Sequence, residues 1–141
     1  MHIVDKPKKN YITKPFKKDY YNNVIKFIDN NSCNSLLDIG CANGSLFFYL
    51  PKKIYKLGID TDYGYLKQAK INNKINNSKF TKINIFNNNL TVKKFIKKNK
   101  NKFDLISLLG TLQVLVDYEL SLKKIIELNP KNIIINCPLN K

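Results

Sequence analysis

The residues best suited to chemistry gather in one stretch, residues 35–46, which read SLLDIGCANGSL. The stretch holds one acid, Asp38, followed by small residues at every second position, Gly40, Ala42 and Gly44. Apolar residues on both sides predict a buried strand, a tight loop and the start of a helix. Small residues let a backbone approach a ligand closely, and unpaired amides at a helix start attract anionic groups. We therefore expect a polar, partly anionic ligand at this loop.

A second acid supports a nucleotide-like ligand. Asp60 closes the run YKLGID, twenty residues after Gly40, where a carboxylate can accept hydrogen bonds from both ribose hydroxyls. The dinucleotide fingerprint G-x-G-x-x-G is a poorer match, because its third glycine would fall on Ser45. The spacing therefore disfavours a nicotinamide-linked oxidoreductase.

Two motifs in register resemble the class I S-adenosylmethionine (SAM) dependent methyltransferases. The pattern D-x-G-x-A-x-G at residues 38–44 is similar to their motif I, in which the position of Ala42 is usually glycine. The segment GIDTDYGYLKQAK from Gly58 is similar to their second strand and following helix, and FDLISLLGTLQVLVD from Phe103 is similar to their motif IV. The resemblance implies SAM as the cofactor, with its methionine end at Asp38 and the loop and its ribose at Asp60.

The resemblance also assigns further residues to the cofactor. Asn84 takes the place of the family's adenine-binding acid after the third strand, and an amide oxygen can still accept that hydrogen bond. The complete set of residues implied to bind the cofactor is Asp38, Gly40, Cys41, Ala42, Gly44, Asp60, Thr61, Asn84, Ile85 and Leu109. No metal site is expected, because the three cysteines form no C-x-x-C pair.

The predicted elements alternate between helix and strand. We predict helices at residues 16–30, 43–51, 63–76, 90–101 and 117–128, and strands at residues 35–39, 55–60, 79–86, 103–109 and 131–137. This pattern indicates an α/β, Rossmann-like doubly wound parallel sheet with strand order 3-2-1-4-5 and an N-terminal covering helix. The ligand is then expected between residues 40–44 and 109–111, at the carboxyl ends of the central strands.

Helical spacing predicts which residues face the core. In the first helix these are Tyr20, Tyr21, Val24, Ile25 and Ile28, with Tyr63, Leu66 and Ala69 in the third helix and Leu120, Ile125 and Leu128 in the last. Tyr11 and Phe16 precede the first helix and are placed to lie over the cofactor mouth.

Composition bounds the remaining choices. The 141 residues suit one domain, taken as residues 16–141 behind a flexible basic lead-in at residues 1–15. The net charge of +15 favours nucleic acid as a partner, but every basic residue is lysine, and arginine is the usual bidentate reader of phosphate and guanine. Nucleic acid is therefore a minor alternative. The odd cysteine count and the lack of an apolar leader or membrane-length segment predict a cytoplasmic protein without a membrane span.

No catalytic residue is identified. The one histidine is His2, in the lead-in, and Asp117, Tyr118 and Glu119 are candidates for a general base by position only. The [DN]-P-P-[YF] motif of amino-directed DNA methyltransferases is absent. A small molecule or a glycan is therefore the expected methyl acceptor.

Two functions remain open at this stage. The first is an active SAM-dependent methyltransferase, and the alternative is a non-catalytic or degenerate SAM-binding domain that serves as a partner subunit. The family's sheet normally has a sixth and a seventh strand, which are not found after residue 137. We expect the apolar edge of the fifth strand to be covered by the chain's own tail, by a second copy in a homodimer, or by a partner chain.

Overall fold

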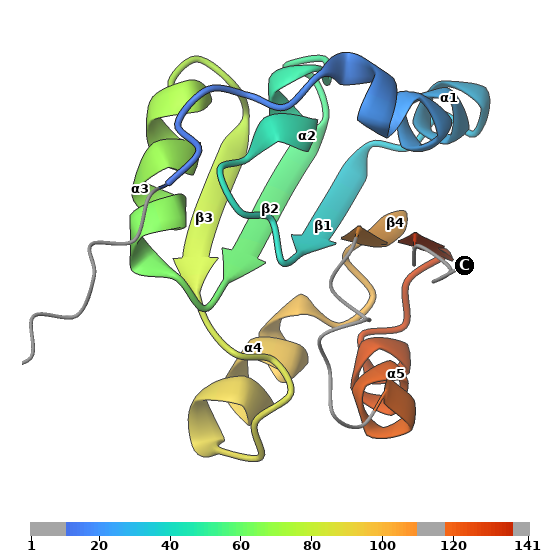
Figure 1. Ribbon diagram of the computed structural model, residues 1–141. Coiled ribbons are helices and arrows are strands. Elements are labelled where there is room, and N and C mark those ends of the chain that lie inside the picture. Colours follow the sequence, from blue (N-terminus) through green and yellow to red (C-terminus); the bar gives the residue numbers. More distant parts are fainter. Residues whose placement is uncertain (1–10, 110–117, 137–141) are drawn as a thin grey trace, which may run out of the picture.

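A five-stranded parallel sheet forms the centre of the molecule (Figure 1). The computed structural model describes residues 11–109 and 118–136. The strands are β1 Ser35–Ile39, β2 Tyr55–Asp60, β3 Ser78–Lys82, β4 Leu105–Leu109 and β5 Asn132–Asn136. Their order is β3-β2-β1-β4-β5, which confirms the predicted Rossmann-like doubly wound topology. The winding reverses between β1 and β4, so a crevice opens at the carboxyl ends of these strands.

Helices cover both faces of the sheet. The helical elements are the 3-10 helix η1 Lys18–Tyr21 and the α-helices α1 Asn22–Asn30, α2 Ser45–Phe48, α3 Tyr63–Asn72, α4 Leu90–Asn99 and α5 Tyr118–Glu127. Figure 1 shows α1, α2 and α3 on one side of the sheet and α4 and α5 on the other. Among the described residues, no helix is both long and apolar enough to cross a bilayer.

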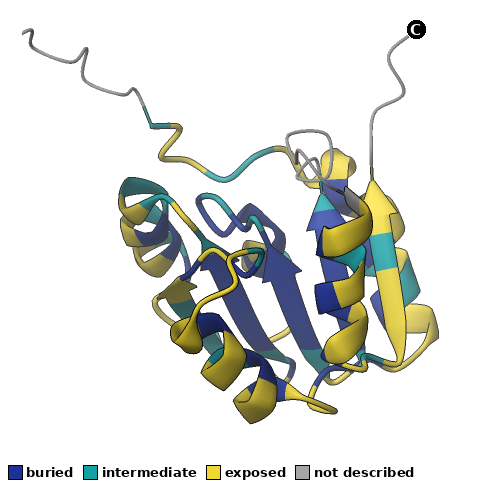
Figure 2. Cartoon of the chain, turned by 90° about the horizontal axis from the view of Figure 1, so that it is seen from below, coloured by how far each residue is buried: buried dark blue, intermediate teal, exposed yellow. Residues whose placement is uncertain are grey.

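Apolar side chains from alternate strand positions fill two core layers. Leu36 and Leu105 pack with Val24, Ile28 and Phe47 under α1 and α2. Their strand neighbours point to the opposite face, where they pack with residues of α4 and α5; this layer includes Leu37, Ile39, Ile106, Leu108, Val92, Ile96 and Ile125. Figure 2 shows the central strands buried along their length. This burial on both faces is the reason that these strands read as nearly continuous apolar runs.

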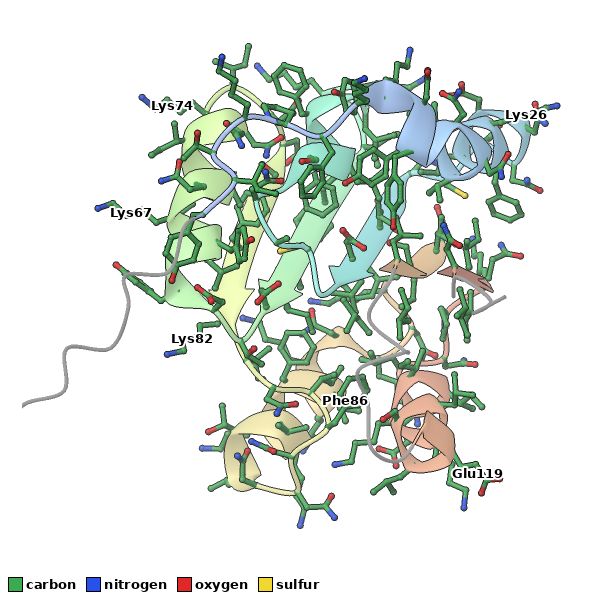
Figure 3. The ribbon with its side chains drawn as sticks, viewed as in Figure 1. Lys26, Lys67, Lys74, Lys82, Phe86 and Glu119 are labelled. Atoms are coloured by element: carbon green, nitrogen blue, oxygen red, sulfur yellow. The ribbon has the colours of Figure 1, made fainter. Side chains whose placement is uncertain are left out.

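Several predicted elements have other bounds, among them the second helix and the third strand. The helix expected at residues 43–51 is only Ser45–Phe48, because the amides of Tyr49 and Leu50 bond three residues back and tighten the chain into a 3-10 turn. The third strand ends at Lys82, and the run to Phe86 is a loop (Figure 3). Ile85 in this loop is buried in the core. Its apolar character therefore reflects burial rather than strand structure.

Three predicted core residues are exposed. Tyr20 is 53% exposed because it lies in η1, whose three residues per turn move it off the apolar stripe of an α-helix. Tyr63 and Leu120 are 66% and 43% exposed, and both lie in the first turn of their helices. The other predicted core residues, Tyr21, Val24, Ile28, Leu66, Ala69, Ile125 and Leu128, are buried, and Ile25 is half-buried.

Candidate cofactor site

The loop after β1 turns back over the end of β2. Gly40 and Gly44 have φ angles of 76° and 71°, and Ala42 has φ 46°, so three residues adopt left-handed backbone. The amides of Gly40 and Cys41 both donate to the carbonyl oxygen of Ile59, at 2.9 and 3.0 Å. Left-handed backbone is accessible to glycine at little cost, while an alanine is strained there by its Cβ. The alternating small residues therefore build the shape of this loop, and Ala42 holds a strained position in it.

The amides of this loop bond within the protein. Besides Gly40 and Cys41, Ala42 donates to Asp60 Oδ2 at 2.9 Å, and Gly44 donates to the carbonyl oxygen of Cys41 at 2.9 Å. The helix that follows has only four residues. These loop amides are therefore occupied within the protein, and α2 is too short to develop a strong dipole; attraction of an anionic group by the amides at the start of α2 stays a prediction. The loop contributes a backbone that a ligand can approach closely.

Asp60 ties the two predicted motifs together. Its Oδ2 accepts from Ala42, and its Oδ1 accepts from the amide of Asp62 at 2.9 Å. A carboxylate has about four acceptor positions, and Asp60 is half-buried rather than enclosed. Acceptor capacity thus remains for ligand hydroxyls. Asp62 is the N-cap of α3, and its side chain accepts from the amides of Gly64 and Tyr65.

Asp38 is a buried carboxylate whose side chain has one hydrogen-bond partner among the described residues. It is 5% exposed, and the hydroxyl of Ser107, its register neighbour on β4, donates to Oδ1 at 2.7 Å. Burial raises the pKa of Asp38 to about 7, the Ser107 hydrogen bond lowers it, and the charge of Asp60 raises it further. Within the described part of the chain no cationic side chain pairs with this carboxylate. A ligand cation beside Asp38 would supply the missing counter-charge.

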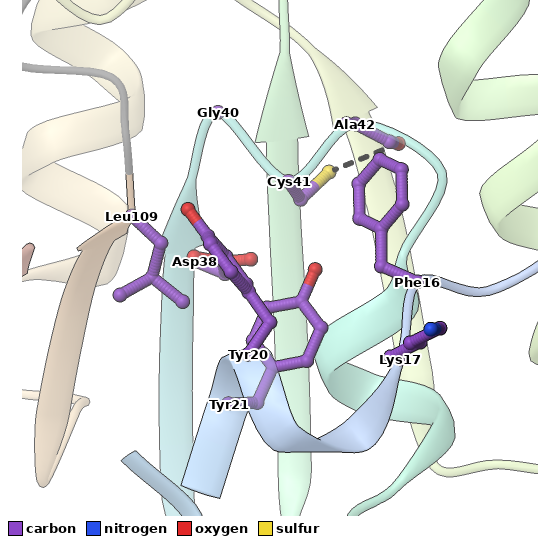
Figure 4. A pocket seen from close by; sticks show the side chains of 9 residues that line it. All are labelled: Phe16, Lys17, Tyr20, Tyr21, Asp38, Gly40, Cys41, Ala42 and Leu109. Carbon is purple, nitrogen blue, oxygen red and sulfur yellow. Dashed lines mark hydrogen bonds between the residues drawn. The ribbon is translucent and has the colours of Figure 1, made fainter. Parts of the chain in front are cut away.

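A cavity of about 450 Å³ opens beside Asp38 (Figure 4). Figure 4 shows Leu109 of β4 on one side and the loop on the other, with Asp38 between them. The lining residues are Phe16, Lys17, Tyr20, Tyr21, Asp38, Gly40, Cys41, Ala42 and Leu109. The predicted meeting of the loop with the end of the fourth strand is therefore seen at Leu109, while residues 110 and 111 lie outside the described residues.

The N-terminal segment is placed over the loop by side-chain amides. Asn43 Nδ2 donates to the carbonyl oxygens of Ile12 and Lys14, at 2.9 and 3.0 Å, and Asn72 Nδ2 donates to that of Thr13 at 2.9 Å. The amide of Phe16 donates to Ser45 Oγ, also at 2.9 Å. These contacts bring Phe16 to the mouth of the cavity, as expected. In a sequence with so many asparagines, the positions of Asn43 and Asn72 offered no signal for this role.

Aromatic residues close the N-terminal side of the site in two places. Tyr11, expected over the mouth, packs edge-on against Tyr65 of α3, with ring centroids 4.9 Å apart. Tyr20 and Tyr21 pack edge-on against each other at 5.0 Å. Tyr11 does not line the cavity, whereas both other tyrosines do. Sequence spacing favoured a place in the core for Tyr20 and Tyr21 over contact with a ligand, whereas both residues line the cavity.

A second hollow, of about 260 Å³, lies around the loop after β3. Its lining residues are Thr61, Lys82, Ile83, Asn84, Asn89, Thr91 and Val92. Asn84 is two residues past the strand and accepts from the amide of Phe86 at 3.1 Å. Thr61 directly follows Asp60 in the chain, whereas Asp60 itself lines neither the first cavity nor this hollow. Contact of Thr61 and Asn84 with an adenine ring stays a prediction.

Two other residues assigned to the cofactor, Ile85 and Gly44, are buried within the protein. Ile85 is 1% exposed and packs in the core layer beneath α4. Gly44 lies against α3, where an added Cβ would stand 2.6 Å from Asn73 Nδ2. Neither residue lines the cavity or the hollow. Their contact with the cofactor therefore stays a prediction.

No general base stands out. Glu119 is exposed on α5 (Figure 3) and does not line the cavity. Asp117 and His2 lie outside the described residues, and Tyr118 begins α5. Burial raises the pKa of the Tyr21 and Cys41 side chains in the cavity wall well above their ordinary values. The structure groups no three metal-ligating side chains within the ranges it describes.

These features fit the cofactor that the motifs imply. SAM carries an ammonium group, two ribose hydroxyls and a base. The described residues offer a buried carboxylate without a counter-charge, a second carboxylate with acceptor capacity left, and a hollow lined by Thr61 and Asn84. The cavity size of about 450 Å³ lies within the range of small-molecule sites.

Solved structures with the same fold include methyltransferases. The methyltransferase domain of bacterial CtHen1 has a TM-score of 0.69 and 18% identity, with 86% of this chain and 65% of that one covered. A SAM-dependent methyltransferase from Clostridium acetobutylicum has a TM-score of 0.64 and 19% identity, covering 86% and 51%. The plantazolicin methyltransferase BamL, solved with a desmethyl analogue and S-adenosylhomocysteine (SAH), has a TM-score of 0.64 and 21% identity, covering 79% and 42%. The chain thus spans less than two-thirds of the length of each.

Sequence comparison identifies the family. No curated protein sequence is significantly similar to the chain. The profile of the methyltransferase domain family matches residues 30–137, which is more than half of the chain and includes every strand. With the strand order, the motif I loop and the two acids in their expected places, the chain belongs to the methyltransferase domain family and has the class I, SAM-dependent form of the fold.

Proposed function

We propose that this domain binds SAM in the cavity at Asp38 and transfers its methyl group to a small-molecule or glycan acceptor. The observation that carries the proposal is the buried carboxylate of Asp38, which faces a cavity and has no cation beside it within the described residues. Keeping such a charge in the core costs stability. A ligand ammonium group beside Asp38 would offset that cost by pairing with the carboxylate.

Each part of the site has a role in this proposal. Asp38 would pair with the ammonium group, and the backbone of residues 40–42 would pass along the methionine chain. Asp60 would accept from the ribose hydroxyls, and Thr61 and Asn84 would border the base. When bound, SAM supplies an electrophilic methyl group on a sulfonium. Leu109 and Tyr21 exclude water from the wall of the cavity where that group would lie.

The acceptor would enter past the N-terminal aromatic residues. Phe16 and Tyr20 line the cavity from the segment that crosses the loop, and Tyr20 is 53% exposed. Aromatic faces pack well against flat rings and against the apolar faces of sugars. Lys17, beside them, is a cation that would attract an anionic or hydroxyl-bearing acceptor. This mouth supports a small ring compound or a sugar better than a protein chain.

Catalysis would rest on alignment. Tyr21 and Cys41 stay protonated at neutral pH because burial raises their pKa values, so neither serves as a base. Holding two reactants in line can supply much of the rate of such a transfer. The acceptor atom is therefore expected to be nucleophilic without strong deprotonation. The same observation favours the second candidate, a SAM-binding subunit without its own transferase activity.

The first experiment is calorimetric titration with SAH. The wild type is compared with Asp38→Asn, in which Ser107 keeps an acceptor, and with Asp104→Asn, a control at the amino end of β4. We expect Asp38→Asn to bind roughly ten- to hundredfold more weakly, since it loses a charge-assisted bond. We expect no change in Asp104→Asn. Equal binding by wild type and Asp38→Asn would refute the placement of the ammonium group.

Transfer of a labelled methyl group then separates the two functions. The wild type and Tyr20→Ala are incubated with labelled SAM and a panel of amines, amino sugars, phenols and neutral sugars. Label in one acceptor, with a raised KM and unchanged SAH affinity in Tyr20→Ala, would support the enzyme. SAH binding with no transfer to any acceptor would support the partner subunit. A cytoplasmic location is part of this proposal, supported by the free thiols of Cys33 and Cys41.

A further inference from the structure

The outer edge of β5 is an unusual surface for this chain. Strand β5 pairs with β4 on one side and with no other strand of the described residues on its outer side. Ile133 and Ile135 are 37% and 38% exposed, and Figure 2 shows β5 exposed along most of its length. Edge strands in native proteins are usually protected from pairing, most often by charged side chains such as lysine.

Charge does not protect this edge. The chain has a net charge of +15, yet the five residues of β5, NIIIN, carry none. The lysine next to the strand, Lys131, is neutralised by Asp104 at 3.0 Å. The edge is therefore apolar and electrically neutral in a molecule that otherwise repels its own copies, which removes the main barrier to pairing at this one place.

The direction of the backbone groups follows from the pairing with β4. The amide of Asn132 donates to the carbonyl oxygen of Asp104 at 3.0 Å. Because backbone groups alternate in direction along a strand, Asn132, Ile134 and Asn136 bond toward β4. Ile133 and Ile135 thus present their N–H and C=O groups to the open edge.

We propose that β5 pairs antiparallel with β5 of a second copy, about a two-fold axis at Ile134. The sequence of the strand is a palindrome, so this register sets Ile133 opposite Ile135 and Asn132 opposite Asn136 on each side of the axis. The outward backbone groups of Ile133 meet those of Ile135 in the partner, which makes four hydrogen bonds across the axis. In this register isoleucine lies opposite isoleucine and asparagine opposite asparagine. The contact is therefore self-complementary, as two-fold symmetry requires.

Other registers satisfy the edge less well. An axis at Ile133 would also align outward backbone groups, but it would set Ile135 opposite Lys131 of the second copy and so bring a charge against an apolar residue. The register at Ile134 instead sets uncharged residues opposite one another and joins two five-stranded sheets into one. This proposal concerns a surface apart from the cofactor cavity and does not depend on SAM binding.

Molar mass in solution is the first test. Light scattering on the 141-residue chain should give twice the chain mass, with dissociation on dilution. Ile135→Lys, which adds a charge at the centre of the joint, should give a monomer. Ile75→Lys is the matched control, because Ile75 is 84% exposed elsewhere on the surface, and it should stay dimeric. Circular dichroism checks that both variants are folded.

Disulfide trapping tests the register. In a Cys137→Ser background, Ile134→Cys places two thiols across the axis at a Cα separation of about 4.5 Å, within the range that disulfides span. Mild oxidation should give a covalent dimer. Ile133→Cys is the control, because its own copy would lie about 9 Å away, and it should stay uncrosslinked. A monomeric wild type, a dimer that survives Ile135→Lys, or crosslinking by Ile133→Cys in preference to Ile134→Cys would overturn the proposal.

Discussion

Replacement of Asp38 by asparagine is expected to stabilise the fold while it weakens the site. Asp38 is buried, and its pKa is raised from 3.8 to about 7, first by burial. In the unfolded chain the carboxyl ionises at its ordinary pKa, so the folded state carries the cost of an ionised group that it disfavours. The amide of the Asp38→Asn variant would keep the hydrogen bond from Ser107 without that charge.

The stability gained by Asp38→Asn should depend on pH in a definite direction. A group whose pKa is raised on folding costs nothing below its unfolded pKa, and the cost grows as the pH rises and is complete above the folded pKa. The difference between a pKa of 3.8 and one of about 7 corresponds to about 4 kcal/mol. The advantage of Asp38→Asn should therefore grow by about 1.4 kcal/mol per pH unit between about pH 4 and pH 7 and then level off.

Urea denaturation at about pH 5 and pH 8 measures this difference. Asp104→Asn is the control with the opposite sign. Its carboxylate accepts from the amide of Asn34 at 2.7 Å, and this hydrogen bond holds the pKa of Asp104 below its usual range. Asp104 therefore stabilises the fold throughout the range above its unfolded pKa of 3.8, so Asp104→Asn should lower the free energy of unfolding by a similar amount at about pH 5 and pH 8. An Asp38→Asn advantage that is equal at both pH values, or a loss of stability at pH 8, would refute the reasoning.

Three further substitutions test the loop and the helix behind it. Ala42→Gly removes a Cβ from a residue at φ 46° and should raise the free energy of unfolding by about 1 kcal/mol in urea titration; a lower urea midpoint would contradict the assigned strain. Gly44→Ala places a Cβ 2.6 Å from Asn73 Nδ2 at φ +71° and should cost about 2 to 4 kcal/mol in the same assay, whereas a wild-type midpoint would show that α3 can move aside. Asp62→Ala removes the acceptor for two amides at the start of α3 and should cost about 1 kcal/mol. Amide exchange should then be faster in the first turn of α3 and unchanged in α4, and uniform protection would argue against the cap.

Much of the site was readable from local sequence. Asp38, Gly40, Ala42 and Gly44 lie within seven residues, and their conformations depend on one tight turn. Asp62 caps α3 through amides two and three residues away. The strand order also followed from sequence, because connections of helical length allow few ways to wind a parallel sheet.

The contacts that complete the site could not be predicted from local sequence. Ser107 reaches Asp38 across 69 residues, through the register between β1 and β4. Asn43 holds the segment that brings Phe16 to the cavity across about thirty residues. Both residues belong to types that are common throughout the chain. Their roles depend on which neighbours the fold sets beside them.

The sequence by itself determined the family, the winding of the sheet and the two acids predicted to bind the cofactor, because these depend on residues close together in the chain and on the period of apolar positions. The tertiary structure alone decided the buried state of Asp38, the place of Tyr20 and Tyr21 in the cavity wall and the backbone groups that β5 presents at its outer edge. Burial, pKa and exposed backbone are properties of packing between distant segments. Such packing cannot be predicted from a local pattern of residues.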